Sequence, residues 1–458
     1  MLVSVVAGCA SELDAREGRI LDALADDNYM WAQREPELVS MKLRKMQRGP
    51  YEWLRGTALL YWRDATDLSG DRTVTQFGSP EASRVLVVGD PHVENVGTYR
   101  AADGTMVVDW NDFDGTAYGP YHVDLRRLAA SFSVLVDLAA PGNRTLATDI
   151  VRAIVASYVA TIAELSTGAR VAALGRGASE LFDDALTRAA TRGAVRFALD
   201  EVAPVVDGLR VLAVGDLEPV APDNVLEDRL FPVTADEASW LDRAIEQWRR
   251  DVGLDAVSAR VLLRGRRIGA GVASYPARRY NLVLAGATAA PDDDLLVELK
   301  ETRDSFVVPR VPQLAAAEWN NPAERVVATQ RRLHARPDSD PLLGAAMVGG
   351  LSVRLRDREA FQRGINAEDV AELVTDDPAA LRSLATLYGR MLARAHGVTG
   401  TADGVPGYTV IAPLIAGRDA SFIDEIVAAA LADADQIRAD ADALRDRDLA
   451  PYVLFGGP

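Results

Sequence analysis

Lysine and cysteine are scarce in this chain of 458 residues. Its 50 basic residues include only three lysines, Lys42, Lys45 and Lys300, so 47 are arginine. Because lysine carries a compact point charge and arginine a planar fork, a lysine kept at the end of an apolar strand is a candidate phosphate ligand. The single cysteine, Cys9, excludes an internal disulfide and any zinc site built on several cysteines. This usage fits a reducing cytoplasm, and we predict a cytoplasmic protein.

Long apolar runs and clustered histidines are also missing. We find no apolar run long enough to span a bilayer and predict no membrane association. Residues 1–10 resemble a lipoprotein signal ending at Cys9, but its basic segment is absent and its apolar run is short. A two-metal phosphoesterase beginning at Asp90-Pro-His92 would need further histidines in clustered pairs, which the chain lacks. The histidines are His92, His122, His334 and His396.

The overall charge excludes one class of partner. Acidic residues outnumber basic residues by 67 to 50, which gives a net charge of −17. Nucleic acids and anionic membranes require a basic face, so we predict no nucleic-acid partner. An anionic substrate would need a local basic pocket.

The residue patterns divide the chain into three parts with an α+β character. Residues 1–255 are mainly helical but include a strand, a loop and a strand–turn–strand between residues 85 and 114. Residues 256–360 contain apolar segments at 260–263, 280–284, 295–299 and 351–355, which predict a small antiparallel sheet. Residues 361–458 are again helical, and we expect them to return to the first part.

Asp90 and Asn95 lie on the loop that follows the apolar segment 85–88. Phosphoryl transfer needs a carboxylate that accepts the incoming hydroxyl proton, and ligands that hold Mg²⁺ across the phosphates. The spacing Asp-x-x-x-x-Asn supplies both groups from one loop. The alternative is a polar turn in which Asp90 caps the backbone. His92 either braces this loop or binds metal.

Three carboxylates follow on the next extended segment: Asp109, Asp112 and Asp114. Mg²⁺ is bound in proteins by one or two carboxylates together with substrate phosphates. Three neighbouring acids in a buried hairpin are costly without a cation, so the cluster favours a metal site over a solvated loop. Asp109 and Asp112 both remain candidates for the main metal ligand.

The glycine pattern Gly269-x-Gly271-x-x-Ser274 lies between two predicted strands, where a flap could cover phosphates with its backbone amides; a plain hairpin turn explains it equally well. Lys300 lies one strand later, where it would reach the α and β phosphates. Glu324 either pairs with Lys300 or completes a helix cap beginning at Asn321.

At this point the motifs resemble a known group. The loop 89–95 resembles the catalytic loop of aminoglycoside phosphotransferases and related kinase-like small-molecule kinases. The segment from Asp112 to Asp124 resembles the one that follows it there, whose first aspartate binds Mg²⁺. The whole chain also resembles the bacterial domain-of-unknown-function family 2252. The shared stretches are Lys45–Gly56, Gly89–Ser131, Gly269–Tyr280, Leu299–Glu301, Arg325–Arg331 and Leu392–His396.

The resemblance implies a two-lobed protein-kinase-like fold in circular permutation, because the catalytic loop precedes the glycine flap and the lysine strand. It favours Asp112 as metal ligand, from its spacing to Asp124. Where the family tends to have an acid, this chain has Ala328, so the partner of Lys300 stays open, with Glu318 a further candidate.

We therefore expect an ATP- and Mg²⁺-dependent phosphotransferase that acts on a hydroxyl of a small molecule, with Asp90 as base. The helices of residues 141–255 are expected to wall the acceptor. Two other classes stay open: a transferase of AMP on the same fold, and a nucleotide-binding regulator without turnover. The acceptor and the oligomeric state are not written in the sequence.

Overall fold

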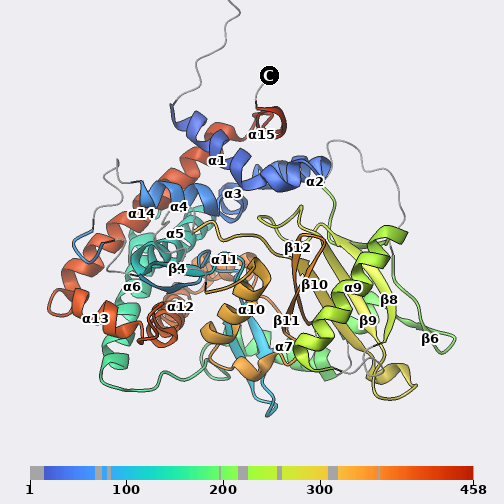
Figure 1. Cartoon of the computed structure of the whole chain (residues 1–458). Helices are drawn as coiled ribbons and strands as arrows, with labels where there is room; N and C mark the ends of the chain where they lie inside the picture. Colours follow the sequence, from blue (N-terminus) through green and yellow to red (C-terminus); the bar gives the residue numbers. More distant parts are fainter. Residues whose placement is uncertain are drawn as a thin grey trace, which may run out of the picture.

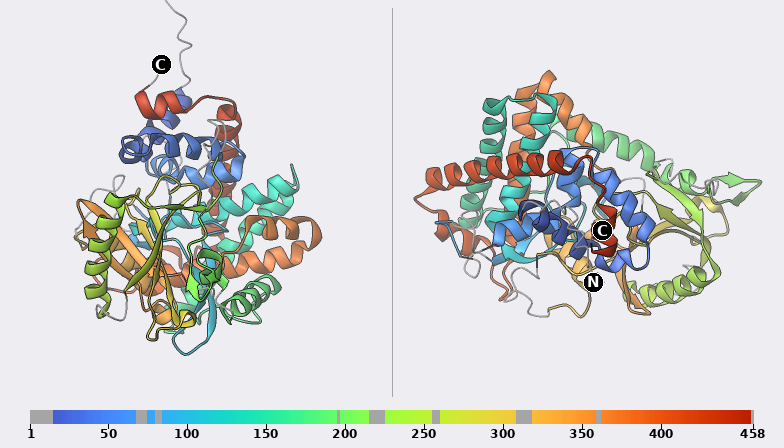
Figure 2. Two further views of the ribbon diagram at one scale, coloured as in Figure 1. Left: turned by 90° about the vertical axis from the view of Figure 1, so that its right-hand side faces the viewer. Right: turned by 90° about the horizontal axis from the view of Figure 1, so that it is seen from above.

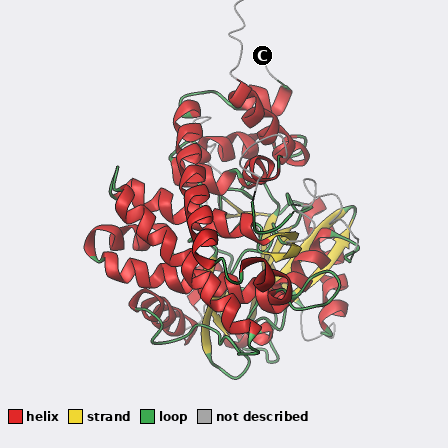
Figure 3. Cartoon of the chain, turned by 90° about the vertical axis from the view of Figure 1, so that its left-hand side faces the viewer, coloured by secondary structure: helices red, strands yellow, loops and turns green. Residues whose placement is uncertain are grey.

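The computed structural model has an α+β fold in which a helical unit lies beside a unit built on a β-sheet (Figure 1). It describes residues 15–67, 75–79, 84–194, 197–214, 225–254, 260–307, 318–358 and 362–456. Cys9 and the signal-like segment 1–10 lie outside these residues. Seen from the side of the helical unit, the molecule presents mainly helices, with strands at one edge (Figure 3).

The helices are distributed over the whole described chain. They are α1 (Ala15–Ala32), α2 (Pro36–Met46), α3 (Pro50–Gly56), α4 (Ala58–Thr66), α5 (Tyr121–Ala139), α6 (Arg144–Ser166), α7 (Glu180–Ala194), α8 (Phe197–Val202), α9 (Ala235–Val252), α10 (Pro322–Leu333), α11 (Ala367–Asp376), α12 (Pro378–Thr399), α13 (Tyr408–Ile415), α14 (Asp419–Leu444) and α15 (Ala450–Phe455).

The strands form one large sheet and three two-stranded pairs. They are β1 (Arg84–Val87), β2 (Val96–Arg100), β3 (Met106–Trp110), β4 (Ala117–Pro120), β5 (Val205–Val206), β6 (Leu209–Arg210), β7 (Arg229–Pro232), β8 (Val261–Ile268), β9 (Arg279–Leu284), β10 (Leu295–Glu301), β11 (Gly344–Val348) and β12 (Leu351–Asp357). The four strands predicted between residues 256 and 360 are confirmed as β8, β9, β10 and β12, whereas β11 was not predicted.

Helices α5, α6, α12 and α14 form the centre of the helical unit, with α12 packed along α6 and α14 against α5. Every residue of α5 from Tyr121 to Val136 is buried. A helix buried on all sides lies in the middle of a core, and α5 therefore gives the neighbouring loops a rigid support.

Helix α6 is, among the described helices, the one with the length and composition to cross a membrane. The expectation that no such segment exists is wrong on those two criteria. However, 56% of its apolar window is buried inside the protein. Because α6 packs against α12, α5 and α14, its apolar residues are those of a core helix.

The large sheet has the strand order β11-β12-β10-β9-β8-β7 and is antiparallel throughout. Side chains alternate between its faces, as the period of two requires. Leu299 and Leu355 point to the face covered by α9, in one apolar cluster with Trp248. Their neighbours Lys300 and Arg354 therefore point to the opposite face, and these two are register partners.

Helix α9 covers one face of the sheet, because its amphipathic side packs there. It begins with a capping box between Thr234 and Glu237 and ends at Gly253, whose φ is 74°. The sequence predicts a domain boundary at residue 255. The structure puts β7 and α9 in the sheet unit, while α11 to α15 lie with the helical unit.

The N-terminal helices cross from one unit to the other, as the view from above shows (Figure 2). Leu38 and Met41 of α2 pack against Tyr275, in the turn between β8 and β9. Glu35, just before α2, forms an ion pair with Arg266 of β8 at 2.8 Å. The first helices thereby join the sheet to the helical unit.

Candidate functional site

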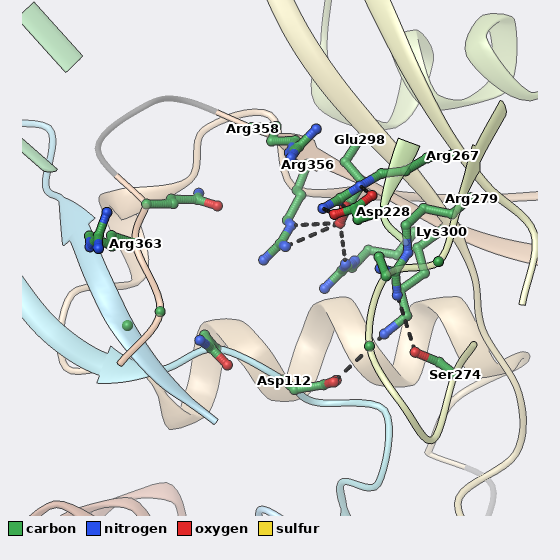
Figure 4. A pocket seen from close by; sticks show the side chains of 18 of the residues that line it. Asp112, Asp228, Arg267, Ser274, Arg279, Glu298, Lys300, Arg356, Arg358 and Arg363 are labelled. Atoms are coloured by element: carbon green, nitrogen blue, oxygen red, sulfur yellow. Dashed lines mark hydrogen bonds and ion pairs between the residues drawn. The ribbon is translucent and has the colours of Figure 1, made fainter. Parts of the chain in front are cut away.

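A cavity of about 480 Å³ lies against the face of the large sheet opposite α9 (Figure 4). Eight basic and four acidic side chains line it, so its formal charge is +4 in a chain of net charge −17. The basic residues are Lys45, Arg267, Arg279, Lys300, Arg354, Arg356, Arg358 and Arg363, and the acidic residues are Asp112, Glu227, Asp228 and Glu298. The structure thus contains the local basic pocket that an anionic substrate needs.

Glu298 lies at the centre of this basic face. It accepts hydrogen bonds from Arg267 at 2.9 Å and from Arg354 and Arg356 at 3.1 Å each. Burial opposes its charged form, yet Arg356, Arg279 and the other arginines hold the pKa of Glu298 well below its ordinary value. One carboxylate therefore fixes the orientation of three guanidinium groups.

At two other arginines of the cavity the carboxylates compensate burial less completely. Burial lowers the pKa of Arg279, and the neighbouring Arg267 adds to this effect although Glu298 opposes it. Burial, together with Arg267, lowers the pKa of Arg358 to about 10. The pKa of each group is lowered because burial and the like charge of Arg267 outweigh the neighbouring carboxylates, Glu298 at Arg279 and Glu298 with Asp228 at Arg358.

Lys300 is buried, with 4% of its surface exposed, and it points into the site. Its Nζ lies 2.6 Å from Asp114 Oδ2 and 3.7 Å from Asp112 Oδ2. Burial alone would raise the pKa of Asp114, but Lys300 and Arg354 outweigh it and lower the pKa to about 2. The late lysine and the early acidic segment therefore meet, and the acids are the partners of Lys300 that the sequence left open.

Asp90 lies on the loop after β1, where Arg127 holds its side chain and Asp124 holds the backbone before it. Its Oδ1 accepts a hydrogen bond of 2.6 Å from Nε of Arg127, whose side chain is completely buried. Burial raises the pKa of Asp90 above its ordinary value, and the negative charge of Asp112 adds to this, although Arg127 opposes it. Asp90 is thus a carboxylate held in one orientation, with increased basicity.

The loop of Asp90 is fixed by Asp124, near the start of α5. The carboxylate of Asp124 accepts hydrogen bonds from the backbone N–H groups of Val88 and Gly89, at 2.8 and 2.9 Å. Nε2 of His396, on α12, lies 3.0 Å from the same carboxylate. Gly89 has a φ of +88° and a Cβ there would lie 2.2 Å from the carbonyl oxygen of Gly115, so this turn requires glycine.

Asn95 turns back toward Asp90. Its Nδ2 donates a hydrogen bond of 2.8 Å to the backbone carbonyl of Asp90, and its Oδ1 makes no hydrogen bond within the described residues. Asp112 Oδ2 faces Lys300, while Oδ1 accepts from the backbone N–H of Asp114. The described residues hold no ready group of three or more His, Cys, Asp or Glu side chains for a metal ion.

Asp109 does not reach the cavity. Both of its oxygens accept hydrogen bonds from Nη2 of Arg394, at 2.8 and 2.9 Å, and they also accept from the backbone N–H groups of Trp110 and Ala335. With 2% of its surface exposed, Asp109 acts as a structural anchor for α12. Of the two aspartates considered as metal ligand, only Asp112 lines the cavity.

Gly269, Gly271 and Ser274 border the cavity on the turn between β8 and β9. Both glycines have positive φ, of 99° and 76°, and a Cβ on Gly269 would lie 2.4 Å from the backbone of Glu227. Ser274 accepts a hydrogen bond of 3.1 Å from Arg279. The turn therefore forms one wall of the cavity, as the flap hypothesis requires.

Glu324 and Glu318 have other partners than Lys300. Glu324 accepts hydrogen bonds from the backbone and the side chain of Asn320, at 3.1 and 2.8 Å, at the start of α10. Glu318 accepts from Tyr118 and pairs with Arg332. Of the two alternatives for Glu324, the structure shows the helix cap in part: Asn321 Oδ1 accepts from the backbone N–H of Glu324 at 3.0 Å, while the Glu324 carboxylate bonds to Asn320.

His92 is buried and its Nδ1 makes no hydrogen bond within the described residues. Its ring instead packs edge-on against Tyr51, with the ring centres 6.2 Å apart. Burial and the nearby arginines lower the pKa of His92 well below its ordinary value. The histidine therefore supports the loop by packing in its neutral form.

A second, smaller depression adjoins Asp90. It is lined by Trp31, Asp90, Asp112, Asp114, Gly115, Ala273, Ser274, Glu301, Arg303 and Phe306. Through Trp31, Arg303 and Phe306 it continues into a cavity of about 160 Å³ beside α1 and α4. None of the described residues of 141–255 lines either space, whereas Glu227 and Asp228 of that range line the main cavity.

Most of the basic face was not predicted from the sequence. The signal that was available is the alternation Val353-Arg354-Leu355-Arg356-Asp357-Arg358, which puts three arginines on one face of a strand. Arg267 and Arg279 lie on other strands and join them only through the strand order.

Comparison with known proteins gives one match at the level of family. Searches of curated proteins and of solved structures each found no match. The model of a family described as an uncharacterized protein conserved in bacteria, DUF2252, matches residues 34–447, which is most of the chain. This confirms the family predicted from the shared motifs, and the chain belongs to the bacterial DUF2252 family.

Proposed function

We propose that this protein is an ATP- and Mg²⁺-dependent phosphotransferase acting on a hydroxyl group of a small molecule. The observation that carries the proposal is the convergence of Lys300, Asp112 and Asp114 at one end of a basic cavity, beside the depression that contains Asp90. Catalysis of phosphoryl transfer is mainly positioning and charge stabilisation, and this arrangement supplies both.

Asp90 is proposed as the general base. The acceptor hydroxyl would give its proton to the Asp90 carboxylate while its oxygen bonds to the γ-phosphorus and the bond to the ADP oxygen breaks. The raised pKa of Asp90 supports this role, because a stronger base accepts the proton more readily. Arg127 fixes the carboxylate so that it does not turn away.

Asp112 and Asn95 are proposed as the residues that hold Mg²⁺. Their donors fit this ion: the hydrogen bond of Asn95 Nδ2 to Asp90 leaves the amide oxygen free within the described residues, and the side chain of Asp112 is 37% exposed. A carboxylate, an amide oxygen and phosphate oxygens are hard ligands of the kind Mg²⁺ prefers. The ion would supply charge neutralisation on the phosphates.

The fold is proposed to be a circularly permuted relative of the kinase-like fold. In support, the sheet with the lysine strand and the turn 269–274 borders one side of the cavity, while the loops of Asp90 and Asp112 border the other. The chain builds the loop side first and the sheet side later, which is the reverse of the usual kinase order. The later helices α11 and α12 then return to the helical unit.

The acceptor is proposed to enter through the space beside α1 and α4. Trp31 and Phe306 provide flat apolar walls there, and Arg303 lies over both rings, 5.0 and 5.8 Å from their centres. Apolar walls with a few polar groups are typical of small-molecule sites. A volume of about 160 Å³ suits a small molecule.

The test is a screen of hydroxyl-containing small molecules with Mg²⁺ and ATP, with wild type and Asp90→Asn. We expect a phosphorylated product from the wild type and a rate at least about 100-fold lower from Asp90→Asn, with ATP binding retained. Asp103→Asn is the matched control, because Asp103 is 56% exposed and lies in the turn of the β2–β3 hairpin.

The outcomes separate the three function classes. An adenylylated product in place of a phosphorylated one would assign AMP transfer. ATP binding without any product or ATP hydrolysis would leave only the regulator, and the enzyme proposal would fail.

A further inference from the structure

The end of the cavity remote from Asp90 differs from a site that recognises a nucleobase. It is formed by residues 97–99 of β2, by Arg356 and Arg358 at the end of β12, and by residues 362–364. Figure 4 shows Arg363 on one side of the cavity and Lys300 on the other, with Arg356 and Arg358 between them. The two ends therefore present cations to the same space.

The backbone at this end has few free groups for a base. The N–H of Thr98 donates to the carbonyl of Arg363 at 2.8 Å, and the N–H of Arg363 donates to Oγ1 of Thr98 at 2.9 Å. The N–H of Ile365 donates to the carbonyl of Val96. These backbone N–H and carbonyl groups are thus used in pairing with β2, and they are not available for hydrogen bonds to the edge of a base.

Apolar surface for stacking is also scarce. Tyr99 is the one aromatic side chain among the described residues that line the cavity, and Ala270 the one aliphatic side chain. Sites for bases and other flat ligands are lined mainly by hydrophobic and aromatic groups. The described lining therefore offers no pair of apolar surfaces that could stack on the two faces of a nucleobase.

Cations without partners concentrate at this end instead. The guanidinium groups of Arg358 and Arg363 make no ion pair or hydrogen bond within the described part of the chain. Elsewhere on this sheet face, beside Lys300 and Glu298, Arg354 Nε and both side-chain polar atoms of Asn281 are buried without a hydrogen-bond partner within the described residues. A bidentate guanidinium group is the side chain best suited to phosphate oxygens.

We infer that the cavity binds phosphate groups at both of its ends, so that its ligand is a phosphate-rich molecule in which a base contributes little. Two sources share this chemistry: a linear inorganic polyphosphate, and a nucleotide with a further phosphate group on its ribose. The inference rests on the proposed function, because it identifies the donor of that site. With a polyphosphate donor, the terminal P–O–P bond breaks, the acceptor oxygen bonds to phosphorus, Asp90 takes the proton, and a chain shorter by one phosphate leaves.

The inference is tested by calorimetric binding of four probes with Mg²⁺: inorganic tripolyphosphate, ATP, adenosine 3′-phosphate 5′-triphosphate and adenosine. We expect tripolyphosphate to bind at least as tightly as ATP and adenosine not to bind. Tighter binding of the doubly phosphorylated nucleotide than of tripolyphosphate would identify the nucleotide source, and the reverse order would identify the inorganic source.

Variants locate the binding. Arg358→Gln and Arg363→Gln should each weaken tripolyphosphate binding by about tenfold, because each removes a charge-assisted contact. Arg152→Gln, which removes an exposed cation on α6 paired with Asp424, should change nothing. Thermal unfolding of each variant shows whether the fold is intact.

Failure of this inference differs from failure of the proposed function. If ATP binds and donates its phosphate while tripolyphosphate does not bind, the inference is overturned and the phosphotransferase remains. Unchanged affinity in both arginine variants would overturn it as well. If no phosphate compound binds, both fail together.

Discussion

The two faces of the six-stranded sheet are built from the same strands but have opposite chemistry. Toward α9, Leu299 and Leu355 are completely buried in an apolar cluster. Toward the cavity, their chain neighbours Arg354 and Arg356 pair with Glu298, and Lys300 pairs with Asp114. Because side chains alternate along a strand, stability and ligand binding are assigned here to adjacent residues. Substitutions one position apart should therefore have separable effects.

The largest effect is expected on the apolar face. Leu355→Ala removes a fully buried side chain and should lower the free energy of unfolding by roughly 2–5 kcal/mol. Anion affinity should stay within about twofold, since the cavity face is untouched. Urea unfolding and ATP binding measure the two quantities. Met347→Ala on the neighbouring β11, where 39% of the side chain's surface is exposed, is the control and should cost less than about 1 kcal/mol.

A smaller effect, measured as a decrease in kcat/KM, is expected for substitutions on the cavity face. Lys300→Arg keeps the positive charge but replaces a compact ammonium by a planar fork, and should lower kcat/KM by about 100-fold. Lys300→Met should lower the rate as much and should also lower stability, because Asp114 loses its partner. Full activity of Lys300→Arg would contradict the distinction between lysine and arginine at this position.

The smallest effect concerns the pH dependence of stability. The pKa of Asp114 is about 2 in the folded protein, below its ordinary value of 3.8. A lowered pKa stabilises the folded state above about pH 4, and this contribution of roughly 2 kcal/mol is lost as the pH falls toward 2. Measured by urea unfolding, the free energy of unfolding should fall between pH 7 and pH 2 by roughly 2 kcal/mol more in wild type than in Asp114→Asn. Parallel curves for the two proteins would mean that Asp114 is not held as an anion by Lys300.

The sequence was sufficient for features that depend on short segments. The loop of Asp90, the acidic segment and the strand ending near Lys300 follow from local patterns, and the structure brings them to one place. The contact of Lys300 with the acidic segment was not predicted, and Glu324 and Glu318 were the candidate partners, because nothing local links residues so far apart.

The features that were missed depend on long-range pairing. Asp109 and Asp112 are both candidate metal ligands in the sequence, and long-range partners separate their environments: Arg394, 285 residues from Asp109, and Lys300 beside Asp112. The basic face requires the register that puts Arg279 and Arg354 on either side of Lys300. The space beside α1 and α4 was not predicted, because the crossing of α1 and α2 between the units leaves no local signal.

The pairing of Asp124 with His396 has a consequence for how the protein is made. The loop of Asp90 is held by hydrogen bonds to Asp124. His396, which also bonds to Asp124, lies on a helix that is synthesised later, 272 residues further along the chain. A chain still emerging from the ribosome has the residues of the loop long before it has the partner that completes their support. The protein should therefore gain its function only after α12 has been synthesised, and chains that terminate before His396 should be inert.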